Sequence, residues 1–172
     1  MKIKLDELKF VEFKLNNLNE ILQLQDEVIL SLENPLLLRK NTPEMFVDCL
    51  TPPNYTIGVK SGDKLIALGV LYLPKDNEED LSHLLIGVDL TGKKSANYKL
   101  CMVAKDYRGN GLQVALGKML EDKAKEYGIN LLCATVSPDN FYSRNNMLKL
   151  GYTFNTTLPK YNGVRDIFYK FI

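Results

Sequence analysis

Residues 105–113 read KDYRGNGLQ, and the interpretation of the whole chain starts from this stretch. Gly109 and Gly111 follow Arg108 closely, and apolar residues at helical spacing begin directly after them. Gly128 stands just past the last apolar position of that pattern, where a glycine commonly ends a helix. We therefore predict a helix over residues 109–127, with the two glycines in the turn that leads into it.

This turn has the properties of an anion-binding site. The first turn of a helix has four N–H groups without intrahelical partners, and the helix dipole adds about half a positive charge there. Glycine lets a ligand approach the backbone, and Arg108 adds a planar fork of donors. The turn would therefore suit a phosphate or pyrophosphate. The alternative is a tight strand-to-helix turn that uses glycine only for its geometry.

Two known phosphate-binding loops do not fit the spacing of this stretch. A dinucleotide fingerprint, GxGxxG, requires a third glycine where the chain has Val114. A P-loop requires GxxxxGK followed by Ser or Thr, but the span from Gly111 to Gly117 is one residue too long and Met119 follows Lys118. A nucleotide-phosphate-binding α/β protein is therefore the least favoured function.

Length and charge exclude several classes of protein. The chain has 172 residues, and no linker divides it, so we expect a single domain over residues 1–172. Its 22 Lys and Arg against 21 Asp and Glu leave a net charge of +1, which gives no argument for nucleic acid or an anionic membrane surface. No apolar run is long enough to span a membrane. The first residues, MKIKLDELKF, lack the apolar core of a signal peptide.

Cysteine and histidine usage points to a reducing compartment without a metal site. Cys49, Cys101 and Cys133 are odd in number and far apart, which favours the cytoplasm over a disulfide framework. Cys101 and Cys133 lie in apolar segments, where buried inert thiols are more common than nucleophiles. The single histidine, His83, has no Cys or His at metal-ligand spacing, so we expect no metal.

Hydrophobic periodicity predicts alternating strands and helices, with an α+β or α/β mixed sheet. The expected strands are residues 8–14, 55–60, 64–73, 98–104, 130–136, 152–157 and 165–172. The expected helices are residues 16–32, a second one that begins at Thr42-Pro43, 109–127 and 138–150. The segment 81–96 stays open, because LLIGVDL could be a strand while TGKKSA reads as a loop. The unit from residue 98 to 136 should form a right-handed parallel crossover.

Two motifs carry a resemblance to a known family. The run from Val103 to Leu112 resembles motif A of the GNAT superfamily of acyl-CoA N-acyltransferases, in which a strand leads through a short turn to Arg/Gln-x-x-Gly-x-Gly/Ala at the start of a helix. Arg108 and Gly111 occupy the first two fixed places, and Gln113 stands where the last Gly or Ala usually lies.

The stretch SPDNFYSRNNMLKLGYTF, residues 137–154, resembles the family's motif B. Asn140 precedes the pair Gly151-Tyr152 by the family's eleven residues, and Ser143 stands where a small residue is usual. The resemblance covers about residues 98–172, and the expected hairpin at 55–73 fits the family's preceding strands.

The resemblance implies a fold, an activity and a cofactor site. The fold is a central mixed, mostly antiparallel sheet of about six to seven strands with about four helices, in which the parallel strands 98–104 and 130–136 splay apart. The activity is acetyl-CoA-dependent N-acetyl transfer to a primary amine of a small molecule or peptide. The implied contacts with acetyl-CoA involve the strand backbone at Met102 and Val103, the turn amides of Arg108, Gly109, Asn110, Gly111, Leu112 and Gln113, and the helix residues Asn140, Ser143 and Met147.

The catalytic groups match the family less well. Met147 stands where the family often has a Tyr that protonates the leaving thiolate, and Tyr142 falls on the opposite helix face. This departure keeps open an alternative, a catalytically weak acyl-CoA-binding module. Asp89 is the candidate general base, although an Asp before Thr91-Gly92 is more typical of a turn.

The acceptor amine is not encoded in any pattern of this sequence. Tyr161 and Tyr169 could line an acceptor pocket, with core or edge packing as the alternative. We expect either a monomer or a homodimer.

Overall fold

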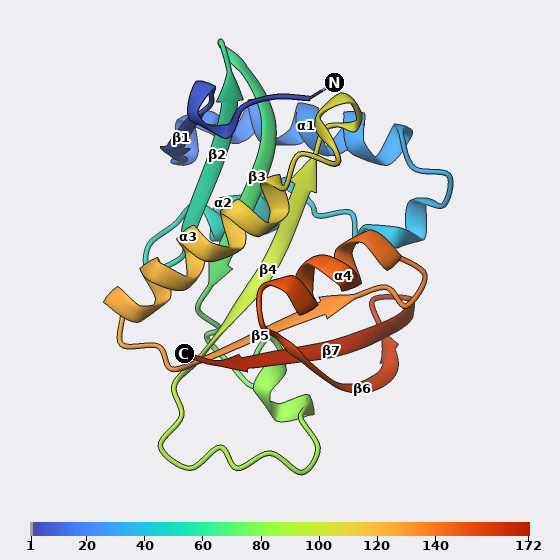
Figure 1. Cartoon of the computed structure of the whole chain (residues 1–172). Helices are drawn as coiled ribbons and strands as arrows, with labels where there is room; N and C mark the ends of the chain where they lie inside the picture. The colour runs from blue at the N-terminus through green and yellow to red at the C-terminus, as the bar shows by residue number, and fades with distance from the viewer. Residues whose placement is uncertain (1) are drawn as a thin grey trace.

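The computed structural model describes residues 2–172, which form one mixed sheet of seven strands in the order β1-β2-β3-β4-β5-β7-β6 (Figure 1). Neighbouring strands are antiparallel except for β4 and β5, which are parallel. This confirms the expected α+β fold with a mostly antiparallel sheet. The strands are β1 Lys9–Glu12, β2 Tyr55–Ser61, β3 Lys64–Tyr72, β4 Ser95–Val103, β5 Leu131–Val136, β6 Thr153–Lys160 and β7 Gly163–Phe171.

Four α-helices cover the two faces of the sheet in pairs. They are α1 Leu18–Leu30, α2 Pro43–Cys49, α3 Leu112–Glu126 and α4 Phe141–Lys149. One buried cluster joins α1 and α2 to the sheet, and a second joins α3 and α4 to the other face, the face in front in Figure 1. We call these the α1–α2 face and the α3–α4 face.

Local sequence explains where the helices begin and end. Thr42 caps α2 by accepting a hydrogen bond from the amide of Met45 at 3.3 Å, and Pro43 occupies the first helical position, as the sequence predicted. Helix α3 begins at Leu112 rather than at the predicted residue 109, because Gly109 and Gly111 have φ of +80° and +75°. Those values belong to the left-handed region and exclude both residues from a helix.

Residues 81–96, which the sequence analysis left unassigned, contain no strand before Ser95. A short 3-10 helix spans Leu81–Leu84, and a loop follows it to the start of β4. Strand β4 therefore begins three residues before the predicted residue 98. Two of the three side chains in this extension are polar, and both donate to the segment before β4: Ser95 donates to Asp80 Oδ1 at 2.9 Å, and Asn97 donates to the carbonyl of Glu79 at 2.6 Å.

None of the helices in residues 2–172 combines the length and the apolar character needed to cross a membrane.

Candidate functional site

The centre of the sheet opens between the two parallel strands. Strands β4 and β5 pair only over Ser95–Asn97 and Leu131–Cys133. Beyond these residues β4 remains paired with β3 as far as Val103, while β5 continues with β7 to Val136. The two strands therefore diverge in a V, as expected from the resemblance, and the edge of β4 that faces β5 has backbone groups free of strand pairing from Tyr98 onward.

A β-bulge lies in β4 beside this opening. Leu71 pairs with Tyr98 and Val70 pairs with Leu100, so Lys99 is an extra residue outside the ladder. Tyr98 belongs to the buried cluster of the α3–α4 face, whereas Leu100 belongs to that of the α1–α2 face. The bulge thus leaves a backbone unit unpaired at the point where the sheet opens.

A cleft occupies the V and is lined from both faces of the sheet, so it passes between the strands. Its lining comes from the α1–α2 connection, β4, the first turn of α3, β5, α4 and the β6–β7 hairpin. The lining residues are Leu37, Leu38, Arg39, Asn41, Tyr98, Lys99, Leu100, Cys101, Gln113, Ala134, Thr135, Val136, Ser137, Asn140, Ser143, Met147, Tyr161 and Arg165.

The N-terminus of α3 offers bare backbone donors beside the cleft. Within residues 2–172 the amides of Leu112, Gln113 and Val114 have no hydrogen-bond partner, and no side chain caps the helix. A Cβ placed on Gly109 or Gly111 would meet nothing within 4 Å, so the space above this turn is open. Unpartnered amides at a positive helix end can hold an anionic group such as a pyrophosphate.

Two polar side chains of the same turn bind the protein itself. Arg108 donates from Nε to the carbonyl of Val103 at 3.1 Å and from Nη2 to Ser31 Oγ at 2.7 Å. Asn110 accepts a hydrogen bond from the amide of Ile3 at 3.0 Å. These contacts fix the shape of the turn, so that its backbone rather than these side chains faces a ligand.

Gln113 joins the two sequence motifs. Its Nε2 donates to Ser143 Oγ at 2.9 Å, and its Oε1 accepts from Asn146 Nδ2 at 2.9 Å. The hydroxyl of Tyr98 donates to the carbonyl of Gln113 at 3.2 Å. Gln113, the residue that departs from the motif, therefore links α3 to α4. Its side-chain amide is hydrogen-bonded to α4 and is not free to bind a ligand.

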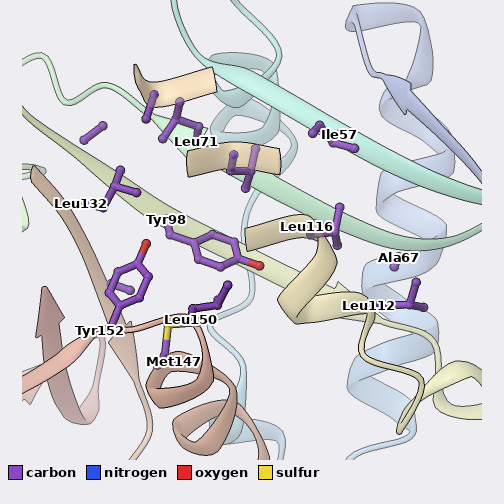
Figure 2. Packing of buried hydrophobic residues seen from close by; sticks show 14 of the residues in the cluster. Ile57, Ala67, Leu71, Tyr98, Leu112, Leu116, Leu132, Met147, Leu150 and Tyr152 are labelled. Carbon is purple, nitrogen blue, oxygen red and sulfur yellow. The ribbon is translucent and has the colours of Figure 1, made fainter. Parts of the chain in front are cut away.

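Asn140 and Met147 form the α4 side of the cleft. Asn140 Oδ1 caps α4 by accepting from the amide of Ser143 at 3.1 Å, which leaves the Nδ2 donor for a ligand. Met147 is buried and lies with Tyr98, Leu150 and Tyr152 between α4 and the sheet (Figure 2). Met147 is thus an apolar wall of the cleft.

Other predicted site residues lie apart from the cleft lining. Asp89 is exposed in the loop before β4, where its carboxylate accepts from the amide of Thr91 at 2.9 Å. Hydrogen bonds from the backbone and side chain of Thr91 lower the pKa of Asp89, as in an ordinary turn. The Met102 side chain is in the core of the α1–α2 face, and that of Val103 packs against the other cluster. The residues of β4 that line the cleft are Tyr98–Cys101 instead.

Sequence reasoning missed most of the charged lining. Arg39, Lys99 and Arg165 come from three separate parts of the chain, and no spacing or motif links them. Of the two tyrosines considered for an acceptor pocket, Tyr161 lines the cleft, while Tyr169 packs beside the 3-10 helix. Among residues 2–172, no three or more His, Cys, Asp or Glu side chains are grouped so as to hold a metal ion.

A model of the Acetyltransferase (GNAT) family matches residues 17–152. The chain belongs to the GNAT acetyltransferase family. The match covers most of the chain and includes the glycine turn, the splayed strands and α4, whereas the cleft-lining residues Tyr161 and Arg165 lie beyond its end. A comparison with curated proteins found no significant match.

Solved structures of other GNAT proteins share the fold at low sequence identity. The chain is similar to yncA of Salmonella typhimurium with its cofactor acetyl-CoA (TM-score 0.71, 11% identity, 96% of this chain and 94% of that one). It is similar to the PaiA N-acetyltransferase of Thermoplasma acidophilum in complex with coenzyme A (0.70, 13%, 96% and 99%). It also resembles the ribosomal-protein-S18-alanine N-acetyltransferase of Escherichia coli (0.67, 15%, 94% and 90%).

Proposed function

We propose that this GNAT protein transfers the acetyl group of acetyl-CoA directly to a primary amine. The observation that carries the proposal is the continuity of one cleft with two features: the unpaired edge of β4 and the bare amides at the start of α3. An extended amide-containing arm and a pyrophosphate, which are two of the parts of coenzyme A, suit these two features. Relatives solved with acetyl-CoA or coenzyme A support the choice of ligand.

Each part of the site has a role in holding the cosubstrate. The free edge of β4, including the backbone of Met102 and Val103, pairs with the pantetheine arm as an added strand would. The turn from Arg108 to Gln113 holds the pyrophosphate through backbone amides. Asn140 donates from Nδ2 to the arm, and Ser143 leaves room beside it. Asp89 lies in an exposed turn outside the cleft lining, and its role as the general base stays a prediction.

The chemistry favours direct attack over an acyl-enzyme. The only thiol in the cleft lining is Cys101, and burial raises its pKa to about 12, so it stays protonated and non-nucleophilic at neutral pH. In direct transfer the amine nitrogen bonds to the acetyl carbon and the carbon–sulfur bond breaks. The amine loses a proton to water, and the sulfur of coenzyme A gains one. In this proposal a backbone amide of β4 at the bulge, where Lys99 lies outside the ladder, polarises the thioester carbonyl.

Tyr98 is our candidate for the hydrogen-bond donor to the leaving sulfur, a role that Met147 cannot take. Its ring belongs to the same buried cluster as Met147 (Figure 2), its hydroxyl donates to the carbonyl of Gln113 at 3.2 Å, and burial holds its pKa well above the ordinary value. A hydroxyl with a raised pKa keeps its proton, so Tyr98 turns from the carbonyl of Gln113 and donates a hydrogen bond to the leaving thiolate, which takes its proton from water. Replacing Tyr98 with Phe should lower kcat while leaving the affinity for acetyl-CoA nearly unchanged.

A second candidate function is a binding module that holds acyl-CoA without turnover. Two observations favour it: Met147 replaces the usual Tyr, and none of the cleft-lining residues is a carboxylate that could accept the amine proton. Release of coenzyme A from acetyl-CoA in the presence of an amine panel separates the two functions.

The first test of the proposal is calorimetric titration of acetyl-CoA into the wild type and into Gly111→Glu, with ATP as the control ligand. The substitution places a negative charge where the pyrophosphate should lie, and we expect at least a tenfold loss of affinity. Gly92→Glu is the matched control, because Gly92 is also exposed, has φ of +68° and has open space at its Cβ. A folded wild type that does not bind acetyl-CoA would refute the proposal.

A further inference from the structure

The cleft lining has a one-sided charge. Its charged side chains are Arg39, Lys99 and Arg165, and none of the residues that line it is acidic. The chain as a whole has a net charge of only +1, so this asymmetry is local. A cleft with an excess of positive charge is a poor place for a cationic ligand and a favourable one for an anion.

Arg165 is a buried guanidinium whose partners are neutral. Only 6% of the residue is exposed, and its two recorded bonds go to carbonyl oxygens: Nη1 to Val164 at 2.9 Å and Nη2 to Leu36 at 3.1 Å. No carboxylate in residues 2–172 forms a salt bridge with it. Burial lowers the pKa of Arg165, and the nearby Arg39 lowers it further, although Tyr161 opposes this. A buried charge of this kind is costly unless an anion compensates it.

Arg39 lines the same cleft as Arg165, and no carboxylate in the described part of the chain forms a salt bridge with it. Its guanidinium carbon sits 3.9 Å from the ring centre of Tyr161. Tyr161 and Asn162 form the two-residue turn between β6 and β7 with φ of 56° and 59°. A tyrosine in the left-handed region is uncommon and unfavourable, so the hairpin keeps a strained conformation that places this ring under Arg39.

The acidic residues near this end of the cleft are already paired with other cations. Glu79 lies 3.1 Å from Lys99 Nζ. Asp166 Oδ2 lies 3.2 Å from Arg144 Nε, which is close enough for an ion pair although not aligned for a hydrogen bond. Each of these cations is therefore neutralised locally, and the positive charge left in the lining is that of Arg39 and Arg165.

We propose that the acceptor amine carries a carboxylate, which Arg39 and Arg165 bind in the cleft. This inference rests on the proposed function, because it names the class of amine that the same cleft would acetylate. The two arginines come from the α1–α2 connection and from β7, across the cleft from the α4 residues assigned to the pantetheine arm. Guanidinium forks match a carboxylate in shape and charge. The amine of such a substrate then faces the bulge at Lys99.

The phosphates of coenzyme A are the competing occupants, and acetyl-CoA affinity tests them. Arg39→Gln and Arg165→Gln should bind acetyl-CoA within about twofold of the wild type, whereas Gly111→Glu should not. A tenfold or greater loss in the arginine variants would show that these cations serve the cosubstrate and would overturn the proposal. The matched control is Lys40→Gln, which removes the neighbouring exposed cation that pairs with Asp26 at 3.7 Å.

A binding experiment tests the carboxylate without requiring turnover. Protein labelled with ¹⁵N and saturated with coenzyme A is titrated with N-acetylglycine or N-acetylleucine, and then with the corresponding neutral amides. The Nε–H resonances of Arg39 and Arg165 are assigned from the Gln variants. We expect saturable shifts of both resonances with the carboxylates, and at least tenfold weaker effects with the amides. Equal responses to acid and amide, or no response to either, would overturn the inference.

Turnover provides the second arm. If the wild type releases coenzyme A, free amino acids should have KM values at least tenfold below those of their amides. Arg39→Gln should remove this preference, and Lys40→Gln should keep it. Arg165→Lys keeps the charge in case Arg165→Gln does not fold, and it should retain part of the preference because it loses only the fork. If the proposed function is wrong, the wild type will not bind acetyl-CoA in the calorimetric titration. If only the inference about the carboxylate is wrong, acetyl-CoA will bind but acids and amides will not differ.

Discussion

Replacement of Gly117 by Ala tests how tightly α3 and α4 pack behind the cleft. Gly117 lies in α3, and a Cβ built on it would be 2.5 Å from Cδ1, 3.0 Å from Cδ2 and 3.3 Å from Cγ of Leu150. Favourable carbon contacts lie at about 3.5–4.0 Å, so Leu150 would have to move by about 1 Å. Leu150 is only 4% exposed and belongs to the same buried cluster as Met147, which leaves it little room to move.

The expected change in stability is a difference between two terms. Overpacking of a buried site costs about 1–3 kcal/mol, while Ala in place of Gly inside a helix recovers about 1 kcal/mol. Gly117→Ala should therefore destabilise the protein by about 1 kcal/mol, which lowers Tm by about 3 °C for a chain of this size. In a Leu150→Ala background the clash is absent, so the same substitution should stabilise by about 1 kcal/mol.

The measurement is a double-mutant cycle by urea denaturation, with fluorescence and circular dichroism as probes of the same transition. We expect Gly117→Ala to lower the free energy of unfolding in the wild type and to raise it in Leu150→Ala. This reversal would isolate the contact between Gly117 and Leu150. The same loss of stability in both backgrounds, or a gain in the wild type, would show that this contact does not limit the approach of α3 to α4.

Three further predictions concern the cap of α4, an ion pair and a thiol. Asn140→Asp should keep the stability of the wild type, because Asp also caps a helix, but it should bind acetyl-CoA about tenfold more weakly by calorimetry because the Nδ2 donor is lost; Asn140→Ala should lose both the affinity and about 1 kcal/mol of stability. The hydrogen bond from Lys60, 2.7 Å from Glu20, lowers the pKa of Glu20, so Lys60→Met should cost up to about 1 kcal/mol above the ordinary pKa of a glutamate. In urea denaturation at a series of pH values, this difference should vanish as pH falls through the folded-state pKa of Glu20, and a constant difference would contradict it. Cys101, with a pKa of about 12, should resist iodoacetamide at pH 8 in the native state, and rapid labelling followed by mass spectrometry would contradict the raised pKa of this half-buried thiol.

Local patterns in the sequence were enough for most elements of the fold. Thr42-Pro43 predicted the start of α2, and Gly128, with φ of +68°, follows the end of α3 as predicted. These predictions succeeded because capping and turn conformations depend on a few neighbouring residues. The segment before β4 stayed open for the opposite reason. Ser95 and Asn97 lack the apolar character of a central strand, and their place in the sheet depends on bonds to Asp80 and Glu79.

The glycine turn was predictable as a place, while the roles of its side chains were not. Arg108 looked like a donor for a ligand, but its fork contacts Ser31 and Val103, one of which is far away in the sequence. Gln113 seemed a departure from its motif, and the structure gives it a function as the link between α3 and α4. The partners of these side chains are set by the tertiary fold, and the spacing of residues along the chain does not encode them.

The sequence by itself therefore determined the order of strands and helices, the glycine turn and the resemblance to GNAT proteins, because all of these depend on residues close together in the chain. Only the tertiary structure decided the charge of the cleft. Arg39, Lys99 and Arg165 are separated by long stretches of sequence and meet because β4 and β5 diverge after a few paired residues. Strand register and the packing of distant segments bring such groups together, and local periodicity does not encode either of them.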